Sequence, residues 1–147
     1  MTPTDRFEVL ESQSEPLPRI VIRSRASGSK ITLDAAVLLA QYAISDDDTL
    51  LVLDEDCPYE ENLHLVLVRG SRVIDHIELG MIYTGGIFKE ISAADDTLRF
   101  RFESDAVWSL TVDSRGKRGI GGLPTGSRRR GHFFSRRYLE LEHGGVA

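Results

Sequence analysis

The sequence has very little of what usually reveals a function. Among its 147 residues there is one cysteine, Cys57, so an internal disulfide is excluded and a reducing compartment is favoured. The longest apolar run, residues 35–40, is far shorter than the roughly 18 residues that a membrane span needs. Residues 1–10 mix charged with apolar side chains and have no continuous apolar stretch, which argues against a secretory signal. We therefore expect a cytoplasmic protein with no membrane partner.

Catalytic and cofactor motifs are missing as well. No serine lies in a G-x-S-x-G turn, and no glycine-rich stretch carries the lysine and hydroxyl of a phosphate-binding loop. Cys57 lies between Asp56 and Pro58, where an acidic neighbour disfavours a reactive thiolate. The four histidines do not have the spacing of metal ligands. We predict a protein that is not an enzyme and that has no cofactor and no metal site.

Acidic residues are absent from one part of the chain, and the rest of the chain is predominantly acidic. Residues 114–138 contain eight Lys or Arg and no Asp or Glu, whereas the rest of the chain carries 10 basic against 23 acidic residues. The two parts thus have formal charges of +8 and −13, which sum to the overall −5. Because summed charge governs association over long range, this segregation points to a binding partner.

Strand-forming residues dominate the middle of the chain. Short turns, such as Gly70-Ser71, separate the apolar runs, so the pattern predicts an antiparallel meander. The six predicted strands are residues 50–53, 63–68, 73–79, 87–91, 98–103 and 107–113. Leu98, Phe100 and Phe102 alternate with charged residues, and Trp108 is expected to oppose them across a hairpin. We therefore predict sheets with one buried and one wet face.

The remaining segments complete the predicted architecture. Residues 1–18 are interpreted as an N-terminal arm, and residues 19–147 as a single β-rich domain with a basic Gly/Arg-rich loop at 114–131. Residues 34–44 are rich in Ala and Leu and predict one short helix. A last strand is predicted within residues 133–141. The expected fold is mainly β, an antiparallel meander forming a sandwich or open barrel, with one short α-helix.

Two of the histidines lie on strands that the Gly70-Ser71 turn makes neighbours. Symmetric pairing about this turn would place His64 opposite Ile77 and His76 opposite Leu65, and would send the two rings to opposite faces. Only a bulge or a register shift would bring them together. The favoured interpretation is a pair of ordinary strand histidines.

Eight carboxylates fall within residues 46–61. An EF-hand calcium loop beginning at Asp54 would need an oxygen ligand at Pro58 and a glycine at Tyr59, so that motif is excluded. Our leading hypothesis is a small non-enzymatic protein-binding module, of the immunity, inhibitor or regulatory accessory type, that uses acidic turns and an exposed sheet face. A second copy of the chain is one candidate partner. The predicted contact residues are Asp46, Asp47, Asp48, Asp54, Glu55, Asp56, Tyr59, Glu60 and Glu61.

Two alternatives remain open. The Arg-rich segment 115–138 combines charge with aromatic rings, as proteins that bind single-stranded nucleic acid do. Its predicted contacts are Arg128, Arg129, Arg130, Phe133, Arg136, Arg137 and Tyr138. Against it, the acidic remainder of the chain would repel a polyanion, and the basic loop could instead fold against the protein's own carboxylates. The other alternative is an enzyme with an unrecognised site, in which Asp75 and His76 would share a pocket.

Overall fold

All the regular secondary structure is β-strand in the computed structural model, which describes residues 1–56, 60–82, 87–102, 106–118, 122–131 and 136–144. The thirteen strands of these residues are β1 (Thr2–Pro3), β2 (Phe7–Gln13), β3 (Arg19–Ser24), β4 (Lys30–Leu33), β5 (Val37–Ala43), β6 (Asp48–Asp54), β7 (Glu60–Arg69), β8 (Arg72–Ile82), β9 (Lys89–Ala94), β10 (Thr97–Arg101), β11 (Val107–Lys117), β12 (Ser127–Arg130) and β13 (Arg137–His143). The prediction of a mainly antiparallel β protein is confirmed.

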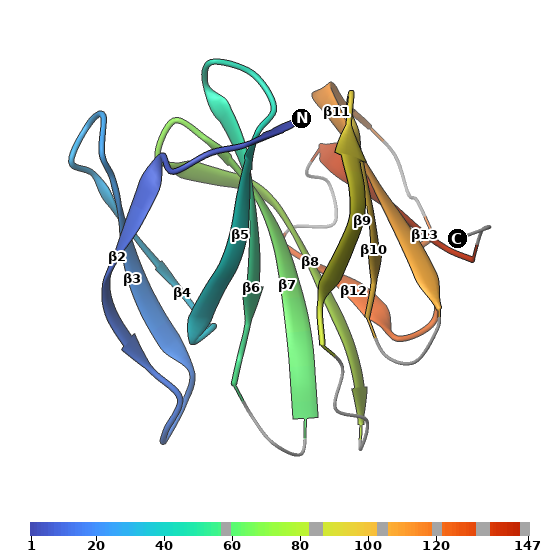
Figure 1. Cartoon of the computed structure of the whole chain (residues 1–147), viewed down its shortest axis with the longest axis horizontal. Coiled ribbons are helices and arrows are strands. Elements are labelled where there is room, and N and C mark those ends of the chain that lie inside the picture. The colour runs from blue at the N-terminus through green and yellow to red at the C-terminus, as the bar shows by residue number, and fades with distance from the viewer. Residues whose placement is uncertain (57–59, 83–86, 103–105, 119–121, 132–135, 145–147) are drawn as a thin grey trace.

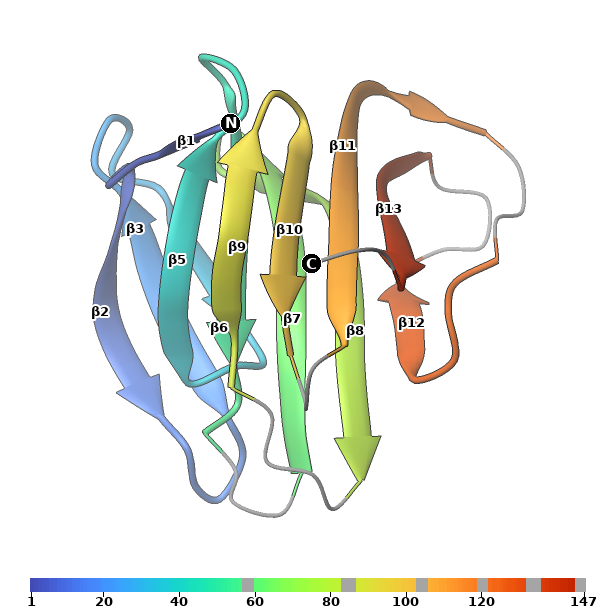
Figure 2. The same ribbon diagram turned by 45° about the vertical axis from the view of Figure 1, so that its right-hand side comes forward.

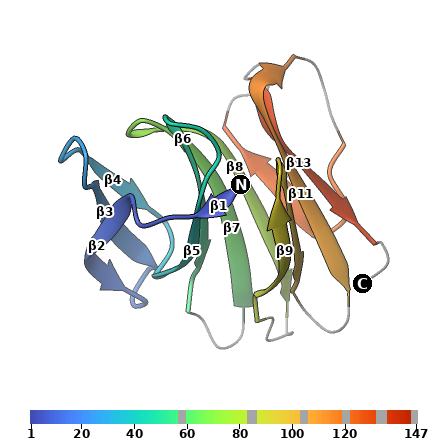
Figure 3. The ribbon, with the colours of Figure 1, turned by 45° about the horizontal axis from the view of Figure 1, so that its top comes forward.

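The strands form three sheets that stack in layers (Figure 1). The central sheet has the order β1-β5-β6-β7-β8-β12, the C-terminal sheet the order β13-β11-β10-β9, and the N-terminal sheet the order β2-β3-β4. Figures 2 and 3 show the N-terminal and C-terminal sheets on opposite sides of the central sheet. The predicted meander is therefore present in two pieces, because the chain leaves the central sheet after β8 and continues in the C-terminal sheet with β9.

The central sheet is buried on both faces. Leu50 and Val52 of β6 belong to the core shared with the C-terminal sheet, whereas Leu51 and Leu53 belong to the core shared with the N-terminal sheet. All four side chains are completely buried. β6 therefore has no solvent-exposed face of the kind predicted. Because the N-terminal sheet covers its second face, its sequence is a continuous apolar run.

The C-terminal sheet follows the predicted alternation. Leu98 pairs with Leu110 and Phe100 with Trp108 across the β10–β11 hairpin, and all four side chains are buried. These residues supply much of the core between the central and C-terminal sheets. The predicted turn at residues 104–106 lies mostly outside the described residues.

The helix predicted for residues 34–44 is wrong, because β5 pairs there with β6. Leu38 pairs with Leu53 and Ala40 with Val52, so Leu39 is an extra, bulged residue. Leu38 consequently packs toward the N-terminal sheet while Tyr42 lies in the opposite core. Because the bulge interrupts the two-residue alternation of β5, the spacing of its apolar residues resembles that of a helix. Within the described residues there is no helix with the length and apolar character to cross a membrane.

The predicted N-terminal arm and the predicted basic loop both contain strands. The arm at residues 1–18 includes β1, which pairs with β5, and β2, which pairs with β3. The basic loop at 114–131 includes the end of β11 and all of β12, and β12 pairs with β8 as an edge of the central sheet.

Candidate functional site

A β-bulge in the β7–β8 hairpin builds the candidate site. The hairpin pairs symmetrically about its turn as far as Val68 and Val73, but Leu67 then pairs with Asp75. Ile74 is therefore an extra residue in β8. One inserted residue moves every later side chain of β8 by one position relative to β7, which changes which side chains share a face.

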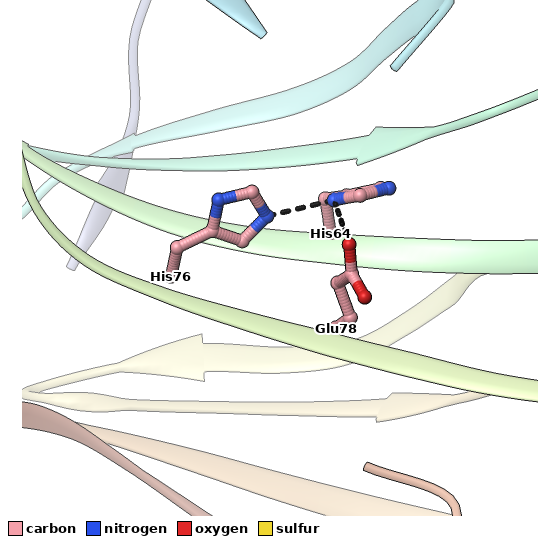
Figure 4. A group of neighbouring side chains, drawn as sticks. All are labelled: His64, His76 and Glu78. Atoms are coloured by element: carbon pink, nitrogen blue, oxygen red, sulfur yellow. Dashed lines mark hydrogen bonds and ion pairs between the residues drawn. The ribbon is translucent and has the colours of Figure 1, made fainter. Parts of the chain in front are cut away.

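The bulge brings the two strand histidines together. His64 lies opposite Glu78, and His76 lies opposite Val66, so both rings project from the same face of the central sheet. The prediction that they face opposite ways is wrong for this reason. Nδ1 of His64 lies 2.7 Å from Nε2 of His76 and 3.8 Å from Oε1 of Glu78 (Figure 4). All three residues are buried.

Glu55, just after β6, holds the other side of the His64 ring. Nε2–H of His64 donates to Oε2 of Glu55 at 2.8 Å. This hydrogen bond leaves the lone pair of Nδ1 directed at His76. A carboxylate that orients a histidine through its outer nitrogen is the arrangement commonly found behind metal-ligating histidines.

Arginines of β12 close this face of the sheet. Arg128 Nε donates to Glu78 Oε2 at 2.5 Å, and Arg130 lies 3.4 Å from Glu78 Oε1 and 2.8 Å from Asp34 Oδ2. Burial raises the pKa of the Glu78 carboxyl, but the hydrogen bond from Arg128 and the nearby positive charges outweigh it and leave the pKa below its usual range. Glu78 is therefore an anion.

His76 is held in its neutral form. Burial, followed by the electrostatic effects of His64 and Arg130, lowers its pKa from 6.5 to about 3. A neutral imidazole can donate, accept or ligate a metal, but it cannot form an ion pair at neutral pH.

Asp75 of β8 and Arg129 of β12 lie on the other face of the central sheet. Arg129 pairs with Oδ2 of Asp75, and the same oxygen accepts the main-chain N–H groups of Tyr138 and Leu139 at 2.8 and 2.9 Å. Asp75 is buried and ties the central sheet to β13. Because neighbouring strand residues alternate, the side chains of Asp75 and His76 face opposite ways and do not share a pocket.

The predicted acidic surface is divided between the two ends of β6. Asp46 and Asp47 are exposed in the β5–β6 turn, whereas Asp48 is buried and accepts two hydrogen bonds from Arg69, at 2.8 and 3.0 Å. At the far end of the strand Glu55 binds His64, as described above, and Asp56 accepts a hydrogen bond from Ser14.

Asp54 completes this second group, and burial raises the pKa of its carboxyl. The two groups lie at opposite ends of the seven-residue strand β6, so they do not form one patch. Tyr59 lies outside the described residues, as do the side chains of Glu60 and Glu61.

The predicted nucleic-acid contacts are also dispersed. Arg128, Arg129 and Arg130 pair with Glu78, Asp75 and Asp34, as the alternative of a basic loop folded on its own carboxylates requires. The ring of Tyr138 lies 5.3 Å from the guanidinium of Arg69. Arg136 donates to the main-chain oxygen of Arg115, Arg137 pairs with Lys117 at the start of β13, and Phe133 lies outside the described residues.

Comparison with known protein families, with curated proteins and with solved structures finds no match to this chain.

Proposed function

We propose that the protein is a small, non-enzymatic protein-binding module that takes an extended segment of its partner into a groove between β2 and β5. The observation that carries the proposal is that two sheet edges flank one groove. The cavity measures about 540 Å³ and is lined by residues of β2, of β5 and of the turns beside them, among them Phe7, Val9 and Leu39.

In the part of the chain that the structure describes, both strands have an unpaired edge along this groove. Among the described residues β2 pairs only with β3, and residues 37–40 of β5 pair only with β6. At one end the side chain of Gln41 accepts from Phe7 N–H and donates to Phe7 O, at 3.0 and 2.9 Å. This amide makes the two bonds that a neighbouring strand would make. An added strand could continue the same pairing beyond it.

Apolar side chains beside the free edges support the same function. Val9 and Leu39 are 46% and 39% exposed, which is high for large apolar residues of strands in a protein with so extensive a core. The favoured partner is therefore a short extended segment with apolar residues at alternate positions. The bulges at Leu10 and Leu39 limit how many of its residues can pair.

The acidic turn adds charge at the neighbouring end of the molecule. Asp46 and Asp47 line a second cavity of about 490 Å³ that shares Phe7 and Arg25 with the groove. A partner that extends beyond the groove would meet these two carboxylates. We propose this arrangement for a module of the inhibitor, immunity or regulatory accessory type, acting in the reducing cytoplasm that a single cysteine favours.

Site-specific photo-crosslinking tests the groove. A photoreactive residue at Leu39 should crosslink one partner protein in cells, and the same residue at Ile91 of β9 should not, although Ile91 is equally exposed at 37%. With the partner purified, Leu39→Asp should weaken binding at least tenfold and Ile91→Asp should leave it unchanged. Equal crosslinking at both sites, or nuclease-sensitive crosslinks to nucleic acid, would contradict the proposal.

A further inference from the structure

We propose that His64, His76 and Glu78 form a binding site for a divalent transition metal, with zinc as the reference ion. The proposal is independent of the groove between β2 and β5. His64 Nδ1, His76 Nε2 and a Glu78 oxygen all lie within 4.8 Å of one another, and the three residues are buried. Two imidazole nitrogens and one carboxylate oxygen are a donor set that zinc accepts.

Two of the three distances between ligand atoms require only small movements, and the third, between His76 and Glu78, is within 4.8 Å. Zinc bonds of about 2.0–2.1 Å in a tetrahedron place the ligand atoms roughly 3.3 Å apart. The two histidine nitrogens, now 2.7 Å apart, would separate by about half an ångström, and Glu78 Oε1, now 3.8 Å from His64, would approach by a similar amount. The proton between the rings would move to Nδ1 of His76, which leaves both facing nitrogens as donors to the metal.

Glu55 is the feature that distinguishes this group from an incidental pair of histidines. Its hydrogen bond to Nε2–H of His64 fixes the ring with Nδ1 directed into the site, and it makes that nitrogen more basic. Glu55 is therefore a positioning residue and not a ligand.

The surrounding charges can accommodate a cation. Three carboxylates, Asp34, Glu55 and Glu78, lie around the site against two guanidiniums, Arg128 and Arg130. Glu78 can keep Arg128 on Oε2 while Oε1 turns from Arg130 to the metal, because Arg130 retains Asp34 as its partner. A cavity of about 310 Å³, lined by Asn62, Glu78 and Arg128 among others, borders the site at Glu78.

Three protein ligands leave one position of the tetrahedron for water or for a group from a partner. An open fourth position is typical of exchangeable or catalytic zinc, whereas purely structural zinc has four protein ligands. We therefore expect a bound metal that exchanges with chelators while the protein stays folded.

The test measures zinc affinity of the full chain, freed of metal by a chelator, in competition with a chromophoric chelator. One equivalent of zinc should bind. His76→Gln should abolish binding at this site, Glu55→Gln should weaken it about 10- to 100-fold, and His143→Gln should leave it unchanged. His143 is a matched control because it is exposed and stacks on Trp108 instead of facing these residues.

A second readout separates metal binding from folding. Cobalt in place of zinc should give the visible absorption of a four-coordinate site in the wild type and in His143→Gln, but not in His76→Gln. Circular dichroism shows whether His76→Gln is folded, and Glu55→Gln tests the site with all three ligands retained. Equal zinc affinity in wild type and all variants, or no binding by the folded wild type, would overturn the proposal.

Discussion

The two faces of β8 carry similar side chains and use them differently. On the face toward the C-terminal sheet, Asp75 pairs with Arg129 and accepts two main-chain N–H groups. On the face toward the N-terminal sheet, Glu78 and two histidines lie beneath Arg128 and Arg130. The two rings hydrogen-bond to each other, and His64 also bonds to Glu55. The first arrangement leaves no ligand position and joins two sheets. The second places two imidazole nitrogens and one carboxylate oxygen within 4.8 Å of one another.

Strand alternation produces this difference from a single Arg-Arg-Arg run. In β12, Arg129 lies opposite Ile77 and points toward the core between the central and C-terminal sheets. Arg128 and Arg130 lie opposite Glu78 and His76. Arg129 thus joins two sheets, whereas Arg128 and Arg130 cover the polar site formed by the histidines and Glu78. Three adjacent arginines therefore do not form one basic surface.

The largest effect should follow from breaking the Asp75–Arg129 pair on the face of β8 toward the C-terminal sheet. Arg129→Gln removes the cationic partner of the buried Asp75 and should lower the free energy of unfolding by about 3 kcal/mol, since a buried charge loses its partner. Arg128→Gln is the matched control, because its side chain is 74% exposed and Glu78 keeps Arg130 as a second partner, and it should cost less than about 1 kcal/mol. Urea denaturation measures both. Equal losses would show that the two faces do not differ in this way.

The second effect is a pH dependence of stability that comes from His76, on the face of β8 toward the N-terminal sheet. His76 has a pKa of about 3 in the folded protein and about 6.5 in the unfolded chain, so between these values the unfolded chain binds more protons. Stability should therefore fall as the pH drops below 6.5, with a slope of up to about 1.4 kcal/mol per pH unit from this group.

His76→Gln should flatten this dependence between pH 6.5 and 5, a range above the ordinary titration of most carboxylates. Urea denaturation at several pH values gives the slope, and His143→Gln should retain the wild-type slope. If His76→Gln keeps the full slope as well, His76 is not the group that titrates.

The sequence predicts the elements better than it predicts the site. Leu98, Phe100 and Trp108 are placed correctly because their alternation and their hairpin are local, and the central strands are apolar enough to be found without knowing their neighbours. The helix prediction fails because the bulge at Leu39 disrupts a two-residue period. Neither this bulge nor the one at Ile74 has a glycine or proline to mark it.

The candidate site depends on the second bulge. His64 and His76 are visible in the sequence as neighbours in a hairpin, but one residue of register decides whether they meet. The partners of β12 are still less accessible, because Arg128 and Glu78 are 50 residues apart and Arg130 and Asp34 are 96 apart. No local pattern encodes contacts over such distances.

The smallest effect should come from the ion pair between Asp34 and Arg130, beside the two histidines on the face toward the N-terminal sheet. The hydrogen bond from Arg130 lowers the pKa of Asp34, yet 70% of the Asp34 side chain is exposed, so Asp34→Asn should cost less than about 1 kcal/mol. In 1 M salt, where the screening length is about 3 Å, this loss should disappear. The loss from Arg129→Gln should persist in the same salt, because its partner Asp75 is shielded from solvent. Denaturation at low and high salt thus distinguishes a pair that solvent screens from one that fixes two sheets together, and a salt-sensitive Arg129→Gln would place both pairs in the same class.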